Sequence, residues 1–116
     1  SSVNIGTSHP YCDNMNVTQH YTFMTPGIQS VSVTFNPESV IESYYDVLKF
    51  SHDAQGYDPI RTFSQGTVGD FQIPTTSFYI HFTSDSSVAP YGFELTLTPQ
   101  ASGGGNGSHN STACLS

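Results

Sequence analysis

Three stretches of this chain alternate between apolar and polar side chains, and this pattern limits the possible folds more than any other feature. They lie at residues 31–35, 78–82 and 93–98. In the first, Val31, Val33 and Phe35 are separated by Ser32 and Thr34. Because successive side chains of a strand point to opposite faces, each stretch predicts a β-strand with one buried face. This alternation is typical of antiparallel sheets that cover a core on one side.

Turn residues divide the remaining sequence into further short segments. Pro26-Gly27, Asn36-Pro37 and Pro74 each interrupt an apolar run, and Pro90 to Gly92 precedes the last alternating stretch. The weaker strand candidates between these turns are Gln19–Met24, Tyr45–Phe50, Ile60–Ser64 and Phe71–Ile73. No helix-length amphipathic pattern occurs. Short strands at this spacing predict an all-β, two-sheet antiparallel sandwich.

The charge of the chain excludes several classes of partner. Its net charge is −7, and Lys49 and Arg61 are its only lysine and arginine. Nucleic acids and anionic lipids both require basic residues, so neither is an expected partner. No apolar run is long enough to span a membrane. An acidic surface instead favours cations and partners that present a basic residue.

The composition changes at Ala101, which divides the chain into two parts. We expect residues 1–100 to form the sandwich and residues 101–116 to form a Gly/Ser/Asn-rich tail. If Cys12 and Cys114 pair, they tie this tail back and close a loop of about a hundred residues, which stabilises by roughly 4–5 kcal/mol. Bonds to a neighbouring chain, or two free thiols, are the alternatives.

Three sequons for N-glycosylation favour a secreted glycoprotein. They begin at Asn16, Asn106 and Asn110. A sequon is used only if the chain passes through a glycosylating compartment. The surface is rich in serine and threonine, and only 9% of the residues are charged, so glycans would add to its solubility. We therefore expect an extracellular protein.

Three carboxylates are placed near the ends of predicted strands. Glu38 follows the strand that ends at Phe35, Asp46 lies at the start of the next candidate, and Asp85 follows the strand that ends near Phe82. If these strands are neighbours, the three acids converge at one end of the sandwich, where they repel one another unless a cation lies between them. Oxygen ligands of this kind suit Ca²⁺. Glu42 is a substitute for Glu38 or a fourth ligand, and solvated turn acids are the alternative reading.

Several of these segments together resemble the CUB domain family, in its calcium-binding form. Glu38 and Asp46 are eight residues apart, 45–48 reads Tyr-Asp-Val-Leu, and the segment 82–93 reads Phe-Thr-Ser-Asp-Ser-Ser up to Gly-Phe. The opening His9-Pro10-Tyr11 is also similar to that of the family. The resemblance implies a jelly-roll-like sandwich, mostly extracellular, that makes protein or carbohydrate contacts without catalysis. It also implies that Tyr11 supports the calcium site and that a basic side chain of the partner approaches the acids.

One departure from the family concerns a disulfide. Ser43 and Ser64 stand where the family usually has two bonded cysteines. CUB-like domains without this bond also occur within large cytosolic proteins, so the resemblance leaves the compartment open.

Nothing in the sequence favours catalysis. The chain has no G-x-S-x-G motif, neither cysteine has a recognisable catalytic setting, and no histidine pair has metal-ligand spacing. Three non-enzymatic functions remain. The first is a module for calcium-supported contact with a protein, or with a glycan. The second is a self-associating subunit of an extracellular fibre or coat, with copies of itself as partners. The third is a regulatory module of a large cytosolic protein.

Overall fold

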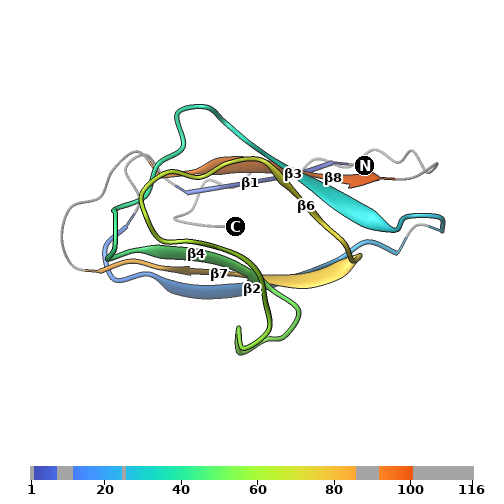
Figure 1. Ribbon diagram of the computed structural model, residues 1–116, viewed down its shortest axis with the longest axis horizontal. Helices are drawn as coiled ribbons and strands as arrows, with labels where there is room; N and C mark the ends of the chain where they lie inside the picture. The colour runs from blue at the N-terminus through green and yellow to red at the C-terminus, as the bar shows by residue number, and fades with distance from the viewer. Residues whose placement is uncertain (1, 8–11, 25, 86–91, 101–116) are drawn as a thin grey trace.

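The computed structural model describes residues 2–7, 12–24, 26–85 and 92–100, and the regular elements in these ranges are all strands. None of the described residues forms a helix of the length and apolarity that a membrane span requires. The strands are β1 (Val3–Gly6), β2 (Asn16–Thr22), β3 (Ser30–Phe35), β4 (Val47–Ser51), β5 (Pro59–Phe63), β6 (Phe71–Ile73), β7 (Ser77–Thr83) and β8 (Glu94–Gln100) (Figure 1). The predicted all-β class is confirmed.

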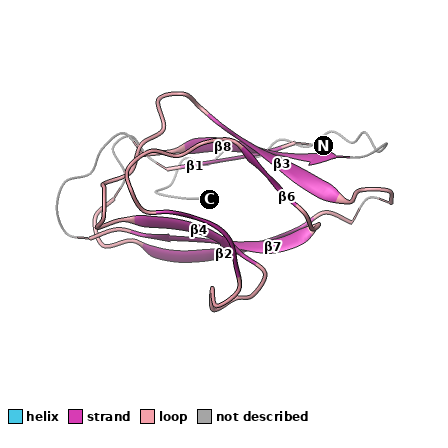
Figure 2. Ribbon diagram, in the orientation of Figure 1, coloured by secondary structure: helices cyan, strands magenta, loops and turns pink. Residues whose placement is uncertain are grey.

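The strands form two four-stranded antiparallel sheets that lie face to face (Figure 2). One sheet has the order β1-β8-β3-β6 and the other the order β2-β7-β4-β5. Strands from opposite ends of the sequence are neighbours in both, because β1 pairs with β8 and β2 pairs with β7. The predicted jelly-roll-like sandwich of two antiparallel sheets is therefore confirmed.

The core lies between the sheets and is built from the apolar positions of the alternating stretches. Val33 on β3 lies opposite Leu97 on β8, and Phe82 on β7 lies opposite Leu48 on β4. All four of these side chains are buried, with relative exposures of 0–1%. The residues between them face outward, as the alternation predicted. The period-2 pattern thus sets the face that each strand turns inward.

Several strands differ from the expected bounds, and β2, for example, begins at Asn16 instead of Gln19 and ends at Thr22 instead of Met24. β1 was not predicted, since Ile5 is the only buried residue among its four and a single apolar position shows no alternation. β4 begins at Val47, two residues later than expected, because Tyr44 has a positive φ of 68° that interrupts an extended strand. The loop that contains this turn carries Glu42 and Asp46.

Gly66 packs against that loop, and we expect it to tolerate no side chain. Its φ is +97°, and an added Cβ would lie 2.5 Å from the Ser43 Oγ. Gly66→Ala should therefore lower the free energy of unfolding by about 1–3 kcal/mol, as measured by urea denaturation. Gly69→Ala is the matched control, because a Cβ there meets nothing within 4 Å. Equal stabilities of the two variants would contradict the prediction.

Candidate metal centre

Three carboxylates meet at one end of the sandwich. One carboxylate oxygen each from Glu42, Asp46 and Asp85 lies within 4.8 Å of the other two. Asp46 directly precedes β4, and Asp85 lies two residues beyond the end of β7. Because β4 and β7 are antiparallel neighbours, with Val47 opposite Thr83, the start of one strand lies beside the end of the other. The strand pairing therefore brings the two aspartates together.

Backbone hydrogen bonds fasten the Glu42 loop to the segment that follows β5. The Ile41 N–H donates to the Gly66 carbonyl at 2.9 Å, and the Tyr44 N–H donates to the Ser64 carbonyl at 2.7 Å. The Ser43 hydroxyl donates to the Gln65 carbonyl at 3.1 Å. The loop is thus held at the place where the resemblance put the family's disulfide, by hydrogen bonds between the same two segments.

Asp46 is the most enclosed of the three acids. It has no exposed surface, and its Oδ1 accepts the backbone N–H of Asp85 at 3.1 Å. Its own N–H donates to the Glu42 carbonyl at 3.2 Å. Burying a carboxylate is costly unless hydrogen bonds or a counter-charge compensate it. Asp46 therefore couples the positions of the other two acids and favours a positive charge beside them.

The turn before β2 holds Asp85 from the other side. The Asn14 N–H donates to the Asp85 carbonyl at 2.8 Å, with Asn14 at a positive φ of 55°. Ser84 is bonded on both sides of this turn. Its hydroxyl donates to the Cys12 carbonyl and accepts the Met15 N–H, at 2.9 and 2.8 Å. These contacts leave Asp85 little freedom to move away from Asp46.

The acids of the cluster repel one another, and this repulsion affects the pKa of Glu42. Burial raises the pKa of Glu42 above its ordinary 4.5, and a side-chain hydrogen bond with Asp85 raises it further. The negative charges of Asp85, Asp46 and Asp13 act in the same direction. A cation between these carboxylates would offset the repulsion that raises the pKa of Glu42.

The donor set suits a hard cation. All three side chains offer oxygen, and the group contains no histidine or cysteine. Ca²⁺ takes six to eight oxygens from carboxylates, carbonyls and water, whereas thiolates and imidazoles favour transition metals. The three carboxylates match the first description in ligand type.

The structure places two of the three predicted ligands in one group, together with Glu42 and without Glu38. Asp46 and Asp85 belong to the group, whereas Glu38 does not. Glu38 is exposed, and its N–H is bonded to the Asn36 Oδ1 in the turn that ends β3. Glu42, the substitute considered for it, lies in the group instead. The Asp46–Glu42 backbone bond is a feature of the folded loop, and the eight-residue spacing of Glu38 and Asp46 in the sequence does not reveal it.

Other predicted residues fall partly outside the described ranges. Asn16 is the exposed first residue of β2, and Cys12 packs against the core. Tyr11, Asn106, Asn110 and Cys114 lie outside the residues that the structure describes. The Cys12–Cys114 bridge, the Tyr11 role and the two C-terminal sequons therefore stay predictions.

Comparison with known proteins gives a match in sequence and a match in fold. No family model matches the chain. It is 30% identical over 94 residues to the human zinc finger ZZ-type and EF-hand domain-containing protein 1, a match that covers 79% of this chain and 3% of that protein. The structure resembles that of the MASP-1 CUB2 domain bound to Ca²⁺, with a TM-score of 0.60 and 18% identity over 81% of this chain and 91% of that one. The chain therefore has the CUB-like β-sandwich fold.

Proposed function

We propose that this chain is a non-catalytic, extracellular interaction module that binds Ca²⁺ through Glu42, Asp46 and Asp85. One observation carries the proposal: these three carboxylates converge within 4.8 Å, and Asp46 among them is fully buried. The structurally similar MASP-1 CUB2 domain was solved bound to Ca²⁺, which supports the choice of ion.

The ion would supply positive charge between the acids, and the residues of the chain would position the acids and form the surface for a partner. Asp46 orients the cluster from within the sandwich, and its bond to the Asp85 N–H holds the segment after β7 against β4. Tyr44 and Tyr45 border the cluster in sequence and are 76% and 69% exposed. Tyrosine is enriched at protein interfaces. A protein partner that presents a basic residue fits this acidic and aromatic surface.

A close serine–histidine pair exists elsewhere but does not favour catalysis. The Ser51 Oγ lies 2.7 Å from His81 Nε2, a distance that suits a nucleophile and its base. Ser51 is fully buried, however, and its hydroxyl donates to the Asp53 carbonyl at 2.7 Å. The second ring nitrogen of His81 is bonded to Thr18 at 3.0 Å instead of to a carboxylate. These bonds form a closed structural chain that holds a loop to the sheet.

The match in sequence favours a second candidate. The chain corresponds to only 3% of the human protein to which it is 30% identical. A chain that matches so small a part of a long protein suits a regulatory module within a large polypeptide. In that case the metal centre would bind its partner in a different compartment, and the residues named here would keep their roles.

Isothermal titration with CaCl₂ tests the proposed site. The wild-type chain should bind one Ca²⁺ with a dissociation constant of roughly 10⁻⁴–10⁻³ M, the range of extracellular modules. Asp85→Ala should abolish the binding. Glu38→Ala is the matched control and should bind as the wild type does, because Glu38 lies outside the group. Binding that is lost with Glu38 and kept without Asp85 would refute the assignment.

A further inference from the structure

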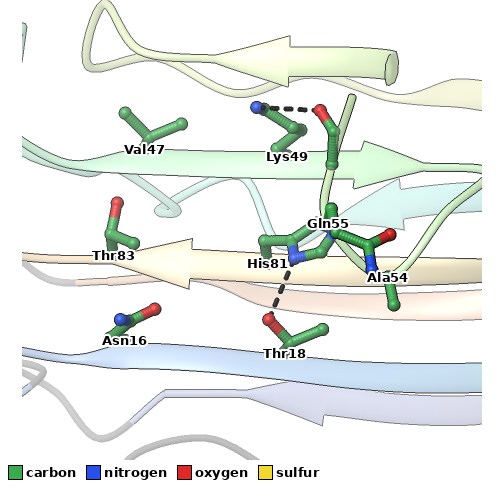
Figure 3. A pocket seen from close by; sticks show the side chains of 9 residues that line it. Asn16, Thr18, Val47, Lys49, Ala54, Gln55, His81 and Thr83 are labelled. Carbon is green, nitrogen blue, oxygen red and sulfur yellow. Dashed lines mark hydrogen bonds between the residues drawn. The ribbon is translucent and has the colours of Figure 1, made fainter. Parts of the chain in front are cut away.

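A polar groove on the outer face of the second sheet is separate from the metal centre. Its volume is about 360 Å³, at the small end of ligand-binding pockets. β2, β7 and β4 form its floor, and residues 54–56 of the loop after β4 close one end (Figure 3). The lining is mixed, because the apolar side chains of Val47 and Ala54 lie beside the polar ones of Asn16, Thr18, Lys49, Gln55, His81 and Thr83.

Several of these side chains are available to a ligand. Among the described residues, Asn16, Gln55 and Thr83 make no side-chain hydrogen bond to another residue. Amide groups and hydroxyls both donate and accept hydrogen bonds. A ligand that carries hydroxyl groups on an apolar frame, as a sugar ring does, matches this mixed lining.

Lys49 gives the groove a positive charge within an acidic molecule. The chain has a net charge of −7 and only two lysines and arginines. The Arg61 guanidinium lies over the ring of Phe71, with its central carbon 4.9 Å from the ring centroid. The Lys49 Nζ donates to the Gly56 carbonyl at 3.3 Å and forms no ion pair with any described residue. An ammonium group has three donors, so two remain for an anionic group.

The groove is built before any ligand arrives. An added Cβ at Gly56 would lie 3.4 Å from the Lys49 Cδ and 3.5 Å from His81 Nε2, so the loop packs closely on both side chains. Asp53 accepts the N–H groups of Tyr57 and Asp58, each at 2.9 Å, which fixes the loop. A preformed site loses less entropy on binding.

We propose that this groove binds a carboxylate-bearing sugar, such as a hexuronic acid at the end of a glycan. Lys49 holds the carboxylate, while Gln55 and Thr83 bond the ring hydroxyls. The residues that line the groove include none of the three acids of the metal centre. This inference therefore stands or fails independently of calcium binding.

The test is an NMR titration of the ¹⁵N-labelled full chain, made without glycosylation because Asn16 is itself a sequon. Glucuronate and glucose are the probes, since they differ only in a carboxylate at C6. Glucuronate should shift the amides of Thr18, Lys49, Gly56 and His81 with millimolar affinity, and glucose should bind about fivefold more weakly or not at all. Added NaCl should weaken the glucuronate binding.

Two variants separate the groove from general charge effects. Lys49→Gln should reduce glucuronate binding to the level of glucose. Arg61→Gln removes the same charge on a strand that does not line the groove, and should leave binding unchanged. Equal binding of the two sugars, shifts outside the groove, or no shift at all would overturn the proposal. An equal loss in both variants would overturn it as well.

Discussion

Replacing Phe82 by alanine should lower the free energy of unfolding by about 3–5 kcal/mol. Phe82 is fully buried, lies between Val17 and Leu48 in the second sheet, and contacts the ring of Phe93 across a centroid distance of 5.1 Å. Domains of this size are stable by roughly 6–17 kcal/mol, so the substitution removes a large share of the total. Urea denaturation followed by circular dichroism measures it.

The same substitution should also weaken Ca²⁺ binding, since β7 carries Phe82 and leads directly to Asp85. Tyr45→Ala is the control for loss of an aromatic ring near the metal centre. Tyr45 is 69% exposed, and its removal should change stability by less than about 0.5 kcal/mol. A Phe82→Ala variant as stable as Tyr45→Ala would show that the two sheets do not depend on this contact.

The strands were predictable where residues that face the core alternate in sequence with residues that face outward. Phe78, Ile80 and Phe82 face the core while Tyr79 and His81 face outward, and this alternation located β7. β1 shows no such alternation, because it has four residues and only one is buried. Its position is set by pairing with β8, a contact across almost the whole chain that no local pattern contains.

The candidate metal centre was predictable to the extent that strand pairing determines it. Asp46 and Asp85 lie at adjacent ends of β4 and β7, so neighbouring strands sufficed to bring them together. The third acid depends on the path of the loop between β3 and β4. That path is fixed by bonds from Ile41 and Tyr44 to residues twenty or more positions later, which local spacing cannot reveal.

The polar groove was not predictable from the sequence at all. Asn16, Lys49 and His81 come from three strands, and only the order β2-β7-β4 places them on one face. The loop that closes the groove depends on Asp53 and on a positive φ at Gly56. A groove whose residues come from separate strands can be recognised only when the order of the strands in the sheet is known.

The pH dependence of stability should report the crowding of the metal-centre acids. The pKa of Glu42 is raised in the folded chain, so the unfolded chain releases this proton at a lower pH. In chelator, Glu42 should therefore lower the free energy of unfolding as the pH rises from 4.5, its ordinary pKa, through its raised pKa in the fold. Above the raised pKa the whole loss of stability is present. Asp53, with a lowered pKa, acts in the opposite direction and is the acid to subtract by an Asp53→Asn variant.

Asp46→Asn should reverse its rank against the wild type when calcium is added. In chelator the variant should be at least as stable, because asparagine keeps the Oδ1 that accepts the Asp85 N–H and removes a charge that repels Glu42. At a Ca²⁺ concentration of a hundred times its dissociation constant, the wild type should gain about 2.7 kcal/mol and the variant almost nothing. Thermal unfolding in both buffers measures the crossing. If calcium stabilised both proteins equally, the ion would lie elsewhere, and the buried carboxylate would be a structural acceptor alone.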